Sequence, residues 1–168
     1  MKASCLRFLL STAAFGIAAL AHASDAPANP AWGKAADNKI LAQAWVNQTM
    51  AANSDLLVIG VHAFRPGTQD ERMIASNLDR INKEDDDDDK GAVAEGKTVL
   101  APNMKDPNKF EVLMPLTDSK GAIVGAIGFV FRYQKGESQI KMLKKATALR
   151  DAFGATLSVA SDLFKPVK

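Results

Sequence analysis

His62 carries the most distinctive chemistry in the chain, because it is the only histidine after residue 22. Its segment, Leu56 to Phe64, is short, apolar and rich in β-branched residues, which predicts a buried strand. Side chains alternate between the two faces of a strand, so Gly60, His62 and Phe64 share one face. An imidazole, an aromatic ring and a gap at a glycine are typical of a pocket wall. The alternative is that His62 closes a strand edge with a single hydrogen bond.

Other polar side chains that could contact a ligand lie on later strands. The segment Arg72 to Asn77 is long enough for a second strand that pairs with the first, and it supplies donors and acceptors but no obvious nucleophile. Ordinary turn hydrogen bonds to the backbone are the alternative. Arg132, at the end of the last expected strand, either pairs with a ligand carboxylate or is a solvated strand end. The candidate ligand-binding residues are His62, Phe64, Arg72, Ser76, Asn77 and Arg132.

Five consecutive aspartates, Asp85 to Asp89, form the strongest charge run in the chain. Adjacent carboxylates repel one another, so the run is expected either to form an extended loop or to bind a cation such as calcium, which takes six to eight oxygen ligands. The spacing does not match an EF-hand, because the glycine and the closing glutamate are missing. A solvated loop is therefore the favoured interpretation, and the sequence assigns no metal ligand.

The residue types that most enzymes use are scarce. The only cysteine is Cys5, and the chain has no G-x-S-x-G elbow, no phosphate-binding glycine loop and no H-E-x-x-H motif. The usual pairs of nucleophile and base therefore cannot be assembled. We expect a protein without catalytic residues and without a cofactor. An unrecognised hydrolase or another enzyme that works with carboxylates alone is the least favoured alternative.

The first 23 residues have the three parts of a cleavable secretory signal peptide. A basic head with Lys2 and Arg7 precedes a short apolar stretch, and Ala21-His22-Ala23 is a small-x-small cleavage site. The apolar stretch is shorter than the roughly 20 residues that span a membrane. We therefore expect a periplasmic protein, in which residues 24–36 form an Ala-, Pro- and Asn-rich linker and residues 37–168 form one domain.

The exported protein is expected to be almost neutral. Without Lys2 and Arg7 it has as many basic residues as its 19 acidic ones. A neutral chain has no long-range attraction for nucleic acid or for an anionic membrane surface. We therefore expect neither as a partner.

The pattern of the domain predicts a helix, two strands, an irregular crossover, three strands and a closing helix. The expected ranges are helix 38–52 with Asp37 as N-cap, strands 56–64 and 72–77, a helical turn within 91–96, strands 98–100, 110–117 and 122–133, and a helix from Ser138 to Phe164. The first helix would place Leu41, Trp45, Gln48 and Ala52 on one stripe. Hairpins at both ends of the sheet imply antiparallel pairing. We therefore expect an α+β fold, with a five-stranded antiparallel sheet and the N-terminal and C-terminal helices on one face.

These segments resemble an extracellular PAS-like sensor domain of the Cache type. The resemblance lies in residues 57–64, 73–77 and 91–98, and in the hairpin, where a strand ending in Pro115-Leu116 leads through an Asp-x-x-Gly turn to a strand with Gly125-x-x-Gly128. It implies a leading helix, two strands, a crossover on the ligand side and three more strands. It also implies that the second strand lines the ligand cavity. Sensors of this type usually feed a cytoplasmic output domain, so the resemblance here implies a stand-alone periplasmic form.

We therefore expect a domain that binds a small-molecule metabolite between the sheet and the crossover 78–102, and that presents it to a membrane sensor protein. This hypothesis predicts a roomy apolar pocket with a few polar groups. On the last strand, the small residues Ala126, Gly128 and Val130 let either a helix or a ligand approach closely, and a helix is favoured. The alternative function is a structural or protein-interaction module with a filled interior, a homodimer through Trp32, Trp45 or the closing helix.

Overall fold

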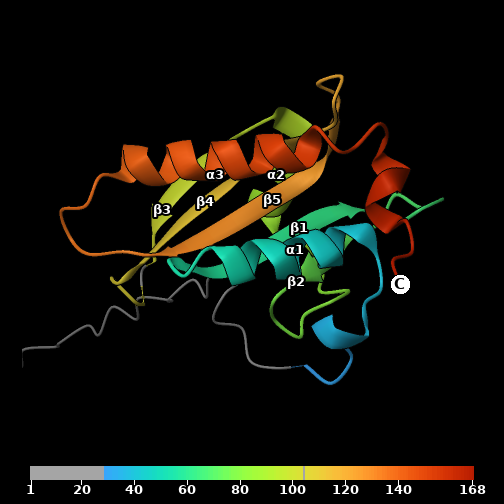
Figure 1. Ribbon diagram of the computed structural model, residues 1–168, viewed down its shortest axis with the longest axis horizontal. Helices are drawn as coiled ribbons and strands as arrows, with labels where there is room; N and C mark the ends of the chain where they lie inside the picture. Colours follow the sequence, from blue (N-terminus) through green and yellow to red (C-terminus); the bar gives the residue numbers. More distant parts are fainter. Residues whose placement is uncertain (1–28, 104) are drawn as a thin grey trace, which may run out of the picture.

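The computed structural model describes residues 29–103 and 105–168 (Figure 1). The expected signal peptide and the first part of the expected linker lie outside these residues. The elements are η2 (Ala35–Asp37), α1 (Leu41–Ala52), β1 (Leu56–Phe64), β2 (Glu71–Ser76), α2 (Asp87–Glu95), β3 (Val99–Pro102), β4 (Lys109–Thr117), β5 (Ile123–Arg132), α3 (Gln139–Gly154) and η3 (Ala160–Phe164). Within the described ranges, none of the helices has the length and apolar character needed to cross a bilayer.

The five strands form one antiparallel sheet in the order β2-β1-β5-β4-β3. The hairpin of β4 and β5 closes through a turn at Asp118, whose carboxylate accepts the N–H groups of Lys120 and Ala122. Gly121 completes this turn with φ at 83°, a conformation that suits glycine. The five-stranded antiparallel sheet predicted from the sequence is confirmed.

The main core lies between the sheet and the two terminal helices, α1 and α3, which cover the same face (Figure 1). Side chains that alternate along β4 and β5, such as Phe110 and Phe129, fill this layer and are fully buried. Trp45 of α1 stacks on Phe153 of α3, with ring centroids 4.4 Å apart. The prediction that both terminal helices share one face is therefore confirmed.

The beginning of α1 differs from the expectation. Asp37 lies in the 3-10 turn η2 and is not the N-cap, because α1 begins at Leu41. The C-terminal segment supplies the missing acceptor, since the N–H of Leu41 donates to the carbonyl of Lys165. The buried stripe of α1 also differs, and consists of Ala42, Gln43, Val46 and Thr49.

The closing helix is shorter than its apolar spacing predicts. α3 ends at Gly154, where a Cβ would clash with the carbonyl oxygen of Thr117 at the end of β4. The chain then turns, and the short 3-10 helix η3 brings Leu163 into the main core, as the preceding turn does for Leu157. The apolar period continues past residue 154 because these side chains remain buried, although the helix does not continue.

α2 packs on the opposite face of the sheet, where Ala92 contacts Leu113 and Ala126 in a second, smaller core. The side chain of Asp86 accepts the N–H of Asp89, and Asp89 accepts the N–H of Asp86, so the two form a capping box at the start of α2. The prediction of a solvated loop for the aspartate run is therefore wrong. Four carboxylates in or next to the first turn of a helix are tolerated because they face the positive end of the helix dipole.

Candidate functional site

The candidate site is a group of four buried ionisable residues between α2 and the sheet, called here the acidic–imidazole cluster: His62, Glu71, Asp85 and Asp89. His62 projects from β1 and is 3% exposed, while Asp85 and Asp89 come from the start of α2. The Nδ1 atom of His62 lies 2.6 Å from Oδ1 of Asp85 and 3.6 Å from Oδ2 of Asp89. Glu71, at the start of β2, completes the cluster.

The local sequence explains this convergence. Asp86 caps α2, so Asp85 stands immediately before the N-cap and Asp89 stands in the first turn; both are buried, while Asp87 and Asp88 are exposed. Gly60 lies next to the histidine ring, where a Cβ would stand 3.1 Å from the Nε2 atom of His62. A glycine at this position leaves room for the imidazole.

Two carboxylate oxygens of the acidic–imidazole cluster have no hydrogen-bond partner among the described residues: Oε1 of Glu71 and Oδ2 of Asp85. Both residues are buried, with Glu71 9% and Asp85 4% exposed. An unpaired buried polar group costs about 1–3 kcal/mol, and more when it is charged. A hydrogen-bond donor or a cation beside these two oxygens would therefore stabilise the cluster.

Burial and neighbouring charges shift the pKa values of the residues in the cluster. Burial raises the pKa of Glu71 to about 7, and the neighbouring charge of Asp85 adds to the increase. Burial also raises the pKa of Asp89 to about 6, against the opposing effect of His62. Burial acts to lower the pKa of His62, but the hydrogen bond to Asp85 and the charges of Asp89 and Asp85 together raise it above its usual value.

These values predict how Glu71→Gln changes stability. The pKa of Glu71 is about 7 in the folded chain, above the 4.5 of an exposed glutamate, so the folded state keeps its proton to a higher pH than the unfolded state does. The stability that accompanies this proton is complete below the unfolded pKa and is lost as the pH rises through 7. Glutamine has no such proton to lose, so we expect Glu71→Gln to be about as stable as the original metal-free protein at pH 5 and more stable than it at pH 8, by about 1–2 kcal/mol.

Urea unfolding of both proteins at the two pH values, with a chelator present, measures this difference. Glu84→Gln is a suitable control, because the Glu84 side chain is 79% exposed. The same stability difference between Glu71→Gln and the original protein at both pH values would contradict the prediction.

Two hollows adjoin the acidic–imidazole cluster. The inner one, beneath α2, has a volume of only about 30 Å³, and its wall includes Gly60, His62 and Asp89. The roomy apolar pocket predicted between the sheet and the crossover is therefore not found there. An outer groove of about 540 Å³ opens beside Glu71 and Asp85, and its other walls include Phe64, Gln69, Asp70, Glu84, Lys90, Val93 and Ala94.

The sequence-predicted residues His62 and Phe64 thus both reach the candidate site: His62 borders the inner hollow and Phe64 borders the outer groove. Ser76 and Asn77 do not reach the acidic–imidazole cluster. Only Ser76 makes a local turn bond, from the N–H of Leu78, and the other side-chain bonds of both residues go to the backbone of β1. The Ser76 hydroxyl donates to the carbonyl of Ile59, and the Asn77 side chain bonds the N–H of Ile59 and the carbonyl of Leu57. These two residues hold the end of β2 against β1.

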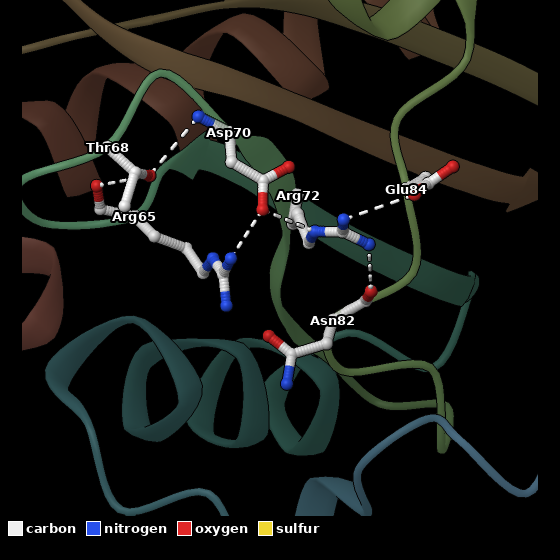
Figure 2. Close-up of polar contacts among 6 residues, drawn as sticks. All are labelled: Arg65, Thr68, Asp70, Arg72, Asn82 and Glu84. Carbon is white, nitrogen blue, oxygen red and sulfur yellow. Dashed lines mark hydrogen bonds and ion pairs between the residues drawn. The ribbon is translucent and has the colours of Figure 1, made fainter.

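Figure 2 shows the surroundings of Arg72 at the edge of the sheet. Its guanidinium donates to Asp70, to Glu84 and to the carbonyl of Asn82, and Arg65 reaches the same Asp70 carboxylate. Carboxylates of the chain therefore already engage Arg72.

Arg132 is exposed, and it lies at the far end of β5 from Ala126, the residue opposite His62. It borders a separate pocket of about 270 Å³ together with Asp55 and Lys145. The structure therefore does not bring Arg132 to the acidic–imidazole cluster. The small residues on one face of β5 have two kinds of neighbour. Ala126 packs on α2, whereas Gly128 and Val130 line the inner hollow.

Sequence reasoning missed Glu71, Asp85 and Asp89. The pattern Asp86-x-x-Asp89 before Ala92 and Val93 is a signal that could have revealed a helix start. A helix capped by Asp86 places Asp89 in its first turn, whereas the position of Asp85, just before the cap, does not follow from helical periodicity. Glu71 gave no comparable signal, because a glutamate at the start of a strand is normally solvated.

No protein-family model matches the chain, and no curated protein matches it. Among solved structures, the GAF domain of A. aeolicus nlh2, crystallised in an inactive state, is similar in fold, with a TM-score of 0.56. The likeness covers 71% of this chain and 86% of that domain, at 10% sequence identity. The chain therefore has a GAF- or PAS-like α+β fold.

Proposed function

We propose that this protein is a non-catalytic, sensor-type domain that binds a small, positively charged ligand at the acidic–imidazole cluster and in the groove beside it. The observation that carries the proposal is the pair of buried carboxylate oxygens without partners, on Glu71 and Asp85. Both residues line the same groove. A ligand that brings N–H donors or positive charge to this groove would lie beside both carboxyl groups, and small side-chain rotations would bring their unpaired oxygens to it.

The size and walls of the groove support a small ligand. Its volume of about 540 Å³ falls within the usual range for ligand sites, roughly 300–1,000 Å³. Acidic residues outnumber basic ones along its walls, where Lys90 is the only basic residue. Phe64, which is 43% exposed, and Val93 offer apolar surface for the body of an organic ligand. This combination favours a cation over an anion.

We further propose that the domain is of the Cache type and works in the periplasm. The support is the signal-like sequence of residues 1–23 and the sequence resemblance described above. In this proposal, the ligand-bound domain is presented to a membrane sensor protein, and binding rather than catalysis is its activity. The absence of a second histidine after residue 22 in the sequence supports this choice.

Thermal unfolding of the purified protein with a panel of small molecules tests the proposal. The panel should hold primary amines, diamines and amino acids, divalent metal ions, and carboxylic acids as the anionic contrast. Ligand at about 100 times its Kd adds roughly 2.7 kcal/mol of stability, enough to raise the Tm by several degrees. We expect cations to raise the Tm, and we expect Glu71→Gln to reduce the shift given by organic cations.

Glu95→Gln is the matched control, because Glu95 lies outside the groove and its side chain is 57% exposed. It should leave the shifts nearly unchanged. The proposal fails if no cation in the panel raises the Tm of the original protein. It also fails if anions raise the Tm as much as cations do.

A further inference from the structure

We propose that His62, Asp85 and Asp89 bind a divalent transition-metal ion such as Zn²⁺. This inference rests on the proposed function, because it names the class of cation that the same site takes. It goes beyond that function because it names the residues that bind the metal, the ions that the site prefers and the two aspartates of the run that take part in binding.

The geometry already brings one nitrogen and two carboxylates together. One ligand atom from each of the three residues can be chosen so that all lie within 4.8 Å of one another. Ligands of a tetrahedral zinc ion, each at 2.0–2.2 Å from the metal, stand about 3.4 Å apart. The separation of His62 Nδ1 from Asp89 Oδ2, 3.6 Å, is close to this value. The distance from His62 Nδ1 to Asp85 Oδ1 is 2.6 Å, so it must increase by less than about 1 Å for both atoms to bind one zinc ion.

The unpaired oxygens are an independent reason to expect an ion. Asp85 is 4% exposed, and its Oδ2 atom has no partner although its Oδ1 atom contacts His62. Glu71 is close enough to feel the charges of Asp85, Asp89 and His62, and its Oε1 atom is also unpaired. The carboxylates of Asp85 and Asp89 thus lie next to one imidazole, and the Glu71 carboxyl lies nearby. A divalent ion would supply the charge that the imidazole alone cannot balance.

The ligand types indicate which ions fit. Imidazole nitrogen suits zinc, iron, nickel and copper, whereas calcium and magnesium prefer oxygen ligands alone. Three protein ligands also leave a coordination position open. Asp85 borders the outer groove, so an ion at this site could be reached from the groove. We therefore infer a reversible site that prefers zinc to calcium or magnesium.

The aspartate run contains its own controls. Asp87 and Asp88 belong to the same run but are exposed, whereas Asp85 and Asp89 are 4% and 5% exposed. Binding by a diffuse patch of negative charge would depend on the exposed pair as much as on the buried pair. Binding at the proposed site would depend only on the buried pair and on His62.

The experiment measures metal binding to the chelator-treated full protein by calorimetry with ZnCl₂ and by visible absorption with Co²⁺. We expect one zinc ion per chain, and a cobalt spectrum with nitrogen and oxygen ligation. His62→Gln and Asp85→Asn should each weaken zinc binding at least tenfold and abolish the cobalt bands. The double variant Asp87→Asn, Asp88→Asn should bind zinc within about twofold of the original protein, and excess calcium should not compete.

Circular dichroism shows whether each variant folds. If the variants unfold, the original protein still gives a test, because the ring-nitrogen NMR signals of His62 must shift when zinc binds. Absence of zinc binding, equal competition by calcium, or equal loss in the Asp87/Asp88 double variant would overturn the inference. If zinc fails while organic amines still raise the Tm through Glu71, only the metal assignment is wrong. If both fail, the proposed function is wrong as well.

Discussion

Replacing His62 with alanine is expected to destabilise the metal-free protein by about 3–5 kcal/mol, the usual cost when one partner of a buried ion pair is removed. His62 is 3% exposed, and its Nδ1 atom lies 2.6 Å from the Asp85 carboxylate. Without the imidazole, Asp85 loses its contact and remains buried beside Asp89 and Glu71. Urea unfolding followed by circular dichroism gives the loss as a lower midpoint with an unchanged slope.

A double-mutant cycle separates this effect from the loss of packing. His62→Ala combined with Asp85→Ala removes both the imidazole and the carboxylate that it leaves behind. We expect the double variant to be at least about 1 kcal/mol more stable than the sum of the single losses implies. Additive losses, or a loss below about 1 kcal/mol for His62→Ala alone, would contradict the contact seen between these residues.

The second large effect is expected for Phe153→Ala, on the other face of the sheet. Phe153 is fully buried, and its ring stacks on Trp45 of α1 with centroids 4.4 Å apart. Removing a buried aromatic ring typically costs about 3–5 kcal/mol, because the surrounding side chains close the cavity only in part. Thermal or urea unfolding measures this loss, and the environment of Trp45 should change in the fluorescence spectrum.

Phe153→Leu is the matched control, since leucine keeps most of the apolar volume but cannot stack. We expect it to lose clearly less stability than alanine, with about 0.5–1.5 kcal/mol of its loss due to the aromatic contact. Equal losses for leucine and alanine would show that packing volume at Phe153 does not determine the stability of the α1–α3 contact.

The sheet and the two terminal helices could be predicted because local patterns determine them. The hairpin of β4 and β5 combines two alternating strands with a turn at Asp118 and Gly121, so each level of the sequence favours the same structure. The end of α3 could not be predicted in this way. Leu157 and Leu163 remain buried after the helix has stopped, and an apolar period does not distinguish a helix from a later turn that packs on the same core.

The prediction of where α1 begins was wrong for a related reason. Ile40 pairs with Pro166, and the carbonyl of Lys165 accepts the N–H of Leu41. The acceptor that begins α1 therefore comes from the other end of the domain, and no local pattern reports it. Aspartate is a common N-cap residue, but Asp37 lies too far before α1, whose N-cap position is taken by Ile40.

The candidate site was only partly predictable. His62 was found because alternation along β1 places it beside Gly60, and both do face the region beneath α2. The role of the aspartate run depends on which of its members caps α2, and repulsion between neighbouring charges points to a solvated loop unless the helix is known. The contact of Asp85 with His62 joins residues on different elements, so only the folded chain reveals it.

The proposed function depends most on a ligand that contacts Glu71 and Asp85. The most direct test is a crystal structure of the protein purified without chelators from the periplasm of an expressing strain, at a resolution that shows ordered ions and small molecules. We expect non-protein density within bonding distance of Oδ2 of Asp85 or Oε1 of Glu71. A structure in which both oxygens pair with atoms of the chain itself, with no bound group beside them, would contradict the account.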